Sequence, residues 1–180
     1  MLRTPRITLV PLADEHLEYE VELDGDPAVM RYLDTGPRSR DAVEQRHRGR
    51  LARASVVPGL GFWAGFVDGC FVGWWILEPW RSVDGAAELG YRLLPRYWRQ
   101  GLASEGAREL LRHGFADLGL KQVFAETMTV NEGSRATMAS VGMRHVETYF
   151  PDVDEPIPGT EQGEVRYLIT RDEWSAGQGT

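Results

Sequence analysis

The chain has 180 residues, of which 42% are hydrophobic and 26% charged, and its formal net charge is −7. This length predicts one domain with a hydrophobic core of its own, and this composition excludes disordered and fibrous classes. Affinity for polyphosphate comes mainly from cationic contacts, so we expect no nucleic-acid partner for so acidic a chain.

Lysine, cysteine and histidine usage excludes further classes. The only lysine, Lys121, follows a leucine and not a glycine, so the chain has no Walker-type phosphate loop. The only cysteine, Cys70, excludes an intrachain disulfide and a cysteine-cluster zinc site. The four histidines are widely spaced, so we expect no metal site. No apolar run is long enough to span a bilayer and no signal-peptide pattern opens the chain, so we expect a cytoplasmic protein without a membrane partner.

The first half of the chain predicts a strand, three helices and a hairpin, at residues 7–10, 14–23, 27–33, 41–54, 62–67 and 70–77. Asp26 followed by Pro27 is typical of a helix N-cap with proline at the first helical position. Asp68–Gly69 joins two aromatic and β-branched runs and indicates a two-residue turn. Trp74 and Trp75 are neighbours in the second run and therefore point to opposite faces, one toward the core and the other a candidate for a substrate pocket.

The second half predicts strands and helices in alternation, at residues 86–94, 102–118, 121–130, 132–141, 143–150 and 164–170. The helix from 102 to 118 is the clearest, because its small and apolar residues form one stripe at helical spacing. Asn131 can cap the next helix. The fold class is therefore α/β or α+β, a mixed sheet with helices on its faces, in a single domain over residues 1–174 followed by a disordered tail over 175–180.

The turn at residues 98–103 is the candidate ligand site. It opens directly into the clearest helix, and a helix N-terminus presents amide N–H groups and a partial positive charge to an anion. Gly101 lets the backbone approach a ligand closely. Residues 92–112 carry five arginines and two glutamates, a positive segment within an acidic chain. The pattern fits a phosphate-bearing ligand, but it also fits an ordinary strand–turn–helix connection with solvated arginines, and residues alone leave both readings open.

Two motifs resemble a known family. Residues 87–95 with 97–105 resemble the acyl-CoA signature of the GNAT superfamily of N-acyltransferases. Asn131–Ser134 followed by Ser140–Met143 is similar to the downstream signature of its Rim-type branch, which includes acetyltransferases of ribosomal-protein N-termini. Trp98 stands where the superfamily often has Gln or Arg, as is common in that branch. The helix after Asn131 has no tyrosine, although many members use one there as the general acid.

The resemblance implies a function and a site. It implies a mostly antiparallel sheet whose central strands, 88–94 and 121–130, splay apart around the pantetheine arm of acetyl-CoA, a co-substrate that needs no metal. The transfer is direct, from acetyl-CoA or another short acyl-CoA to a primary amine. The general base would be Glu88 and the hydroxyl donor to the leaving thiol Ser134. The residues implied to bind the cofactor are Leu93, Arg99, Gln100, Gly101, Leu102, Ala103, Ser104 and Asn131.

Several alternatives stay open. Glu126, in the strand opposite Glu88, is the rival catalytic carboxylate. Asn131 can be a helix cap, a ligand of the cofactor, or both. The whole chain could instead be a non-catalytic acyl-CoA sensor, or a nucleotide-binding protein that uses the same helix start. The acceptor is an amine-bearing small molecule or a peptide or protein N-terminus, contacted by residues 27–60 and 150–163. The acidic loop over 151–163 predicts a cationic or neutral acceptor. Homodimer formation is also left open.

Overall fold

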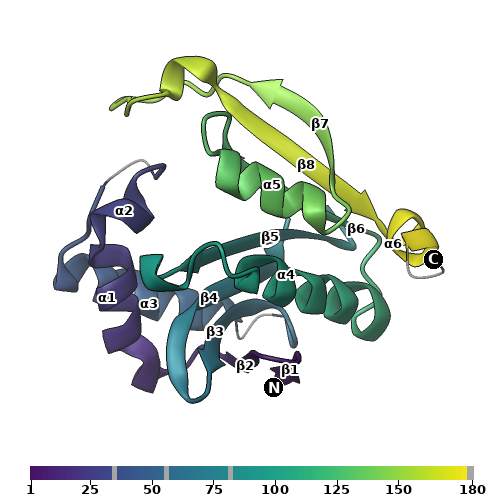
Figure 1. Cartoon of the computed structure of the whole chain (residues 1–180), viewed down its shortest axis with the longest axis horizontal. Coiled ribbons are helices and arrows are strands. Elements are labelled where there is room, and N and C mark those ends of the chain that lie inside the picture. Colours follow the sequence, from purple (N-terminus) through teal and green to yellow (C-terminus); the bar gives the residue numbers. More distant parts are fainter. Residues whose placement is uncertain (34–35, 55–56, 81–82, 178–180) are drawn as a thin grey trace.

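The computed structural model describes residues 1–33, 36–54, 57–80 and 83–177. Its strands form one sheet in the order β1-β2-β3-β4-β5-β6-β8-β7 (Figure 1). The strands are β1 (Leu2–Arg3), β2 (Thr8–Pro11), β3 (Gly61–Val67), β4 (Cys70–Pro79), β5 (Ala86–Leu93), β6 (Gln122–Met128), β7 (Arg144–Tyr149) and β8 (Glu164–Thr170). The helices are α1 (Leu17–Gly25), α2 (Pro27–Met30), α3 (Arg40–Ala54), α4 (Leu102–Arg112), α5 (Glu132–Ser140) and α6 (Arg171–Gly177). Short turns of helix complete the chain at η1 (Asp14–His16), η2 (Pro95–Tyr97), η3 (His113–Asp117) and η4 (Thr160–Gln162).

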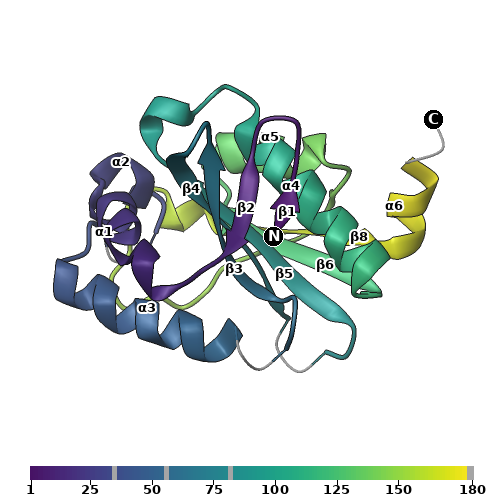
Figure 2. The same ribbon diagram turned by 90° about the horizontal axis from the view of Figure 1, so that it is seen from below.

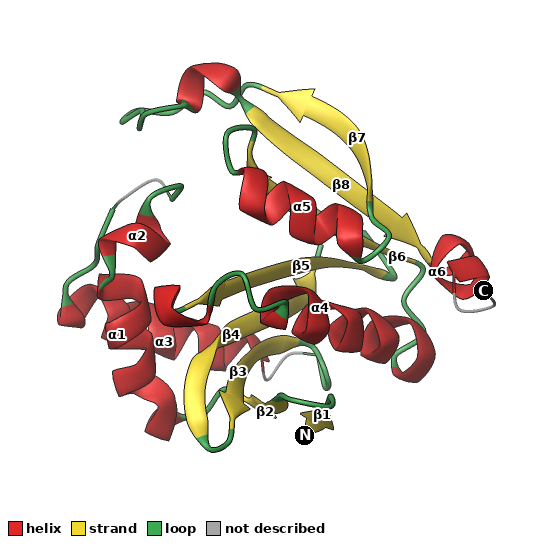
Figure 3. Ribbon diagram, in the orientation of Figure 1, coloured by secondary structure: helices red, strands yellow, loops and turns green. Residues whose placement is uncertain are grey.

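The sheet parts at its centre. Strands β5 and β6 are the parallel pair, and they pair only over Ala86–Glu88 and Gln122–Phe124, whereas β5 continues to Leu93 and β6 to Met128. The other strand pairs are antiparallel. Beyond the paired residues, β8 and β7 rise away from β5 and leave a wedge between the two halves of the sheet (Figure 3). The predicted mixed sheet with a central splay is therefore confirmed, and we call the space between the unpaired ends of β5 and β6 the splay.

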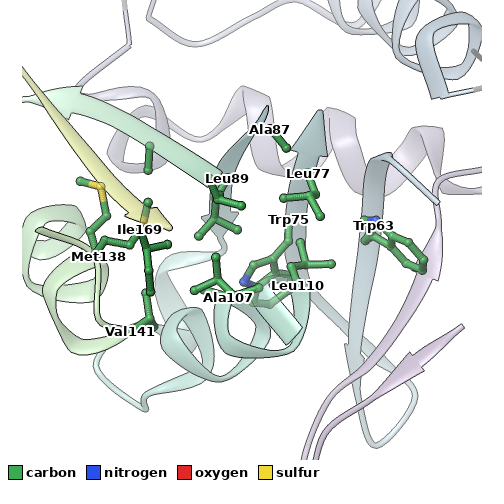
Figure 4. Close-up of a cluster of buried hydrophobic side chains, with 14 of the residues drawn as sticks. Trp63, Trp75, Leu77, Ala87, Leu89, Ala107, Leu110, Met138, Val141 and Ile169 are labelled. Atoms are coloured by element: carbon green, nitrogen blue, oxygen red, sulfur yellow. The ribbon is translucent and has the colours of Figure 1, made fainter. Parts of the chain in front are cut away.

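Helices cover both faces of the sheet (Figure 2). The larger core lies under α4 and α5, where Trp75, Leu89 and Leu110 pack together (Figure 4). The Trp75 ring fits against α4 only because Gly106 has no side chain, since a Cβ there would lie 2.4 Å from the ring. The second core lies under α1 and α3 and includes Trp74. Trp74 and Trp75 do face opposite ways, but both are buried, so Trp74 is a core residue rather than an exposed pocket wall.

The end of the domain differs from the sequence expectation. Residues 175–177, placed in a disordered tail, belong to α6, and residues 178–180 lie outside the described residues. Helix α6 forms because a reciprocal cap opens it: the Thr170 amide donates to the Glu173 carboxylate at 2.8 Å, and the Glu173 amide donates to Thr170 Oγ1 at 3.3 Å. Arg144 also pairs with Glu173. These bonds hold the Glu173 pKa down at about 2, so the cap stays charged at neutral pH.

Candidate active site

The turn before α4 has the backbone of an anion cradle. Arg99 and Gly101 both adopt left-handed conformations, with φ of 57° and 77°. Such residues turn successive amide N–H groups toward one concave point, and Gly101 also stands at the N-cap of α4, where the first-turn amides are unpaired. A non-glycine residue with positive φ is costly, so the structure around Arg99 must hold it there. The turn therefore suits a phosphate group in shape as well as in sequence.

The N-terminal segment holds this turn in place, which sequence reasoning missed. Arg6 donates to the Gln100 carbonyl at 2.9 Å and forms an ion pair with Glu105 at 2.6 Å. Thr4 donates a further bond to Glu105. Burial raises the Glu105 pKa, but the bonds from Thr4 and Arg6 outweigh it and lower the pKa overall. Arg6 therefore fixes the turn and neutralises Glu105, the acidic residue in the first turn of α4. The sequence around position 100 does not predict this contact.

The other residues predicted to bind the cofactor in this turn differ in burial and in what their side chains contact. Leu102 is buried and packs into the core, so only its backbone can face a ligand. The Ala103 carbonyl accepts a bond from the Trp75 indole at 3.1 Å, which anchors the start of α4 to the sheet. Ser104 Oγ lies 2.9 Å from Ser140 Oγ on α5. The Gln100 side chain donates to the Arg96 carbonyl and stabilises the turn itself. The cradle is therefore made by backbone groups, and the side chains fix its shape.

The β5 edge of the splay presents backbone groups to the gap. The Leu94 amide donates to Val72 of β4, and hydrogen-bonding directions alternate along a strand, so the peptide groups of Leu93 and Tyr91 face the splay. The Leu93 carbonyl is already taken, because the Trp98 indole N–H donates to it at 2.7 Å. An extended ligand in the splay would therefore pair with the Leu93 N–H and the peptide groups of Tyr91. Trp98 braces the end of β5 against the turn before α4, which gives this tryptophan a physical role.

Asn131 and Ser134 lie on the other side of the splay, at the start of α5. The Asn131 side-chain oxygen accepts the Ser134 amide at 3.2 Å, and its amide group donates to Thr127 at 3.0 Å. Asn131 is thus the cap of α5, which is one of the roles that the sequence predicted for it. The Ser134 hydroxyl lies 3.2 Å from the Tyr91 hydroxyl, which reaches across from β5. This contact places the phenol of Tyr91 beside Ser134, whereas α5 itself carries no tyrosine.

Glu88 approaches the splay from the opposite face. It is the last β5 residue paired with β6, so its side chain lies where the strands begin to part. Alternation along β5 places Tyr91 and Leu93 toward α4 and α5, and Glu88 and Arg92 toward α1 and α3. Glu88 is half-buried and stands opposite Glu78 of β4. The two residues predicted to be catalytic, Glu88 and Ser134, therefore face the splay from opposite sides.

Glu126 shares the face of Glu88 but is held differently. Its carboxylate pairs with Arg166 of β8 at 2.6 Å, and the Arg166 guanidinium also lies over the Trp80 and Tyr149 rings. Glu126 thus helps to join β6 to β8. The choice between Glu88 and Glu126 as the base is left to their variants.

A small hollow of about 50 Å³ lies at the open end of the splay. Tyr32, just after α2, forms one wall, and Met128 at the end of β6 forms the floor. The loop before β8 supplies the opposite wall, with Glu155 and Glu164 as its charged members. The two regions expected to contact the acceptor, residues 27–60 and 150–163, therefore meet in one place (Figure 1). A larger, shallow depression of about 370 Å³ is lined only by α3 residues and takes in nothing from β5, β6, α4 or α5.

Buried ion pairs fasten α1 and α3 to β5. Asp24, which is fully buried, accepts bonds from Arg50 at 2.9 Å and from Arg92 at 2.8 Å. Glu20, also buried, accepts from Arg50 at 2.8 Å and lies 2.7 Å from His47 Nδ1. Both arginines lie over the Trp74 ring. Burial lowers the pKa of Arg92, and the Asp24 carboxylate counteracts that shift. This network sets the acceptor-side helices against the strand that borders the splay, and no motif in the sequence predicts it.

Comparisons with known proteins decide which family this architecture represents. A family model described as an acetyltransferase (GNAT) domain matches residues 6–144. The chain belongs to the GNAT acetyltransferase family. Among GNAT relatives, it is 48% identical over 181 aligned residues to FsC-acetyl coenzyme A-N(2)-transacetylase from Aspergillus fumigatus, covering 96% of this chain and 77% of that one.

Solved GNAT structures share the fold. The ribosomal L7/L12 alpha-N-protein acetyltransferase RimL, in complex with coenzyme A, matches with a TM-score of 0.80 at 15% identity, over 94% of this chain and 97% of that chain. Spermidine N-acetyltransferase from Vibrio cholerae, in complex with CoA and spermine, matches with a TM-score of 0.79 at 16% identity. The match covers 96% of this chain and 99% of that chain. The Rim-type resemblance is therefore one of several within the family.

The described residues add two further findings. They contain no group of three or more His, Cys, Asp or Glu side chains placed to hold a metal ion. Within the same residues, no helix combines the length and apolar character needed to cross a membrane.

Proposed function

We propose that the protein transfers an acetyl group from acetyl-CoA directly to a primary amine, with the cofactor in the splay. The carrying observation is the left-handed pair Arg99 and Gly101 at the start of α4, beside the part of β5 that runs on beyond its pairing with β6. The backbone from Arg99 to Ser104 would hold the pyrophosphate, and the Leu93 N–H would pair with the pantetheine arm. Asn131 acts by holding the start of α5, which borders the thioester end. Acetyl-CoA supplies the activated acyl group.

Glu88 and Ser134 carry the proton transfers. An amine attacks a thioester only in its neutral form, and most amines are cationic at neutral pH, so a base must take a proton. Glu88 takes it from the acceptor side of the splay, directly or through one water. Ser134, on the α5 side, donates a hydrogen bond to the departing sulfur. The placement of the two groups supports these roles, because the attacking nitrogen and the departing sulfur are different substituents of the same tetrahedral carbon and need separate partners.

The acceptor is a cationic or neutral amine that enters through the hollow between Tyr32 and the loop before β8. Glu155 and Glu164 line that hollow, and none of its described lining residues is basic, so an acidic acceptor would be repelled. The relatives support an amine: one is named an N(2)-transacetylase, and a structural neighbour was solved with spermine.

An amine panel tests the proposal. Release of free CoA thiol from acetyl-CoA is measured with peptide N-termini, polyamines and small amino compounds, for the wild type and for Glu88→Gln. We expect turnover of at least one amine class, with kcat lower by roughly 10–10³-fold in Glu88→Gln and CoA affinity unchanged. Glu126→Gln is the matched control and should keep most of the rate. Binding of acetyl-CoA without turnover of any amine would support the sensor alternative, and loss of rate in Glu126→Gln alone would move the base to that residue.

A further inference from the structure

Tyr91 is a half-buried, titratable residue to which the family motif assigns no role. It lies in the middle of the unpaired part of β5, two residues before Leu93, and packs against the core under α4. Its hydroxyl lies 3.0 Å from the Ser134 carbonyl and 3.2 Å from Ser134 Oγ. Tyr91 and Ser134 are 43 residues apart in the chain. The contact bridges the splay, joining the strand that borders it on one side to the helix that borders it on the other.

The two hydroxyls have one proton each, and this limits how they can bond. The Ser134 carbonyl can only accept, so the Tyr91 proton goes to it at 3.0 Å. The contact between the two hydroxyls then uses the Ser134 proton, which the Tyr91 oxygen accepts until a stronger acceptor, such as a thiolate, takes its place. Burial raises the pKa of the Tyr91 hydroxyl to about 12, although bonds to Ser134 and Thr137 partly counteract this. Tyr91 therefore remains a neutral donor across the working pH range.

We propose that Tyr91 is a positioning residue for Ser134. By donating to the Ser134 carbonyl and accepting from Ser134 Oγ, it holds the serine hydroxyl in the place from which its proton turns to the sulfur of CoA. The inference rests on the proposed role of Ser134 and goes beyond it. The phenol that many relatives carry on the helix is here supplied from the strand, and it acts through the serine.

The chemical step balances without a proton leaving Tyr91. The amine nitrogen forms a bond to the acetyl carbon, the carbon–sulfur bond breaks, and its electron pair goes to sulfur. The amine proton goes to Glu88. The sulfur leaves as a thiolate that accepts the Ser134 hydrogen bond, and solvent protonates it after release. A thiolate is an accessible leaving group because an ordinary thiol has a pKa near 8.5. Tyr91 and Ser134 lower the barrier by stabilising that charge.

Titration of the thiol in the binary complex with CoA tests the inference without turnover. The ultraviolet absorbance of thiolate is followed against pH for the wild type, Tyr91→Phe, Ser134→Ala and the double variant, each with a blank that lacks CoA. We expect the thiolate-to-thiol ratio at a fixed pH to fall about tenfold in each single variant, the size of one hydrogen bond. The double variant should fall no further, because Tyr91 acts through Ser134. In steady-state assays kcat should fall by a similar factor while KM for acetyl-CoA stays constant.

Tyr167→Phe is the matched control, because it removes a hydroxyl from a buried tyrosine of the same core, on β8. It should leave the thiol titration unchanged. A structural role for Tyr91 would lower the melting temperature and weaken acetyl-CoA binding but leave the ratio at its wild-type value, and that result overturns the inference. If Ser134→Ala also leaves the ratio unchanged, the proposed role of Ser134 fails as well. A shift in Ser134→Ala without one in Tyr91→Phe refutes only the role of Tyr91.

Discussion

The proposed cofactor side and the proposed acceptor side of the splay are built in different ways. On the cofactor side, the turn at Arg99–Gly101 is a short backbone feature, which Arg6 braces from far along the chain. On the acceptor side, α1 and α3 are held by buried ion pairs between residues far apart in the chain, such as Asp24 with Arg92. The first kind of site tolerates wide change in side chains, and the second depends on them.

This difference bears on how a family keeps one cofactor and changes its acceptor. Backbone amides recognise phosphate whatever the neighbouring side chains are, so the cofactor turn needs only its left-handed positions and its helix start. The acceptor side is assembled from α2, a loop and strand ends, which can vary without disturbing that turn. The contrast predicts that substitutions on the acceptor side act through stability or substrate preference, while those on the cofactor side act through CoA affinity.

The largest effect should come from Asp24→Ala, which removes the carboxylate shared by Arg50 and Arg92. Arg92 would then lose its charge partner and Arg50 one of its two, in a largely buried site, and breaking a buried pair typically costs about 3–5 kcal/mol of unfolding free energy. The change is measured by urea denaturation at neutral pH. Glu22→Ala is the matched control, because Glu22 lies on the same helix and pairs with Arg96 at the surface. An exposed pair of this kind contributes less than about 1 kcal/mol. Equal losses in the two variants would contradict the contrast drawn above.

A smaller effect, about 10²-fold in CoA affinity, is expected for Gly101→Val. The nearest atom to a Cβ at this position is Arg6 Nη2 at 3.5 Å, so the new Cβ makes an ordinary contact with that side chain and does not clash with the core. It would, however, disfavour the left-handed backbone and crowd the phosphate position. Calorimetry measures the affinity. Gly69→Val is the control: Gly69 has a φ of 78°, nothing lies within 4 Å of its Cβ, and it stands in the hairpin turn between β3 and β4. Both variants should lose similar stability, and only Gly101→Val should lose CoA affinity.

Local signals made the turns and helix starts predictable from sequence. The caps at Asp26 and Asn131, the turn at Asp68–Gly69 and the glycine before α4 all act within a few residues, and each stands where its pattern placed it. The predicted helix 27–33 ends at Met30, because one turn satisfies the Asp26 cap and the chain then bends.

Contacts between distant residues could not be predicted in this way. Arg6 supports the phosphate turn from 94 residues away, and Tyr91 meets Ser134 across the splay. Such pairs depend on the register of the sheet, which the hydrophobic pattern of single strands leaves undetermined. The start of α6, by contrast, is a local pattern, Thr170 with Glu173 three residues on, and the predicted tail over 175–177 does not take it into account.

The smallest effect, and the sharpest test of the acceptor side, is expected for Glu164→Gln. Glu164 lines the hollow and accepts a bond from the Tyr149 hydroxyl at 2.9 Å, and burial together with this carboxylate raises the pKa of Tyr149. Glutamine keeps the shape and the acceptor for Tyr149 but removes the charge. A half-exposed charge contributes up to about 1 kcal/mol, so KM for a diamine should rise roughly two- to fivefold, with kcat and CoA affinity unchanged.

Glu161→Gln, on the same loop but outside the hollow, is the control and should leave KM unaltered. The effect should shrink in high salt and be weaker for a neutral monoamine, because it is electrostatic. A KM for the diamine that does not respond to Glu164→Gln at low salt, or a preference for acidic amines, would show that the carboxylates of this hollow do not select the acceptor.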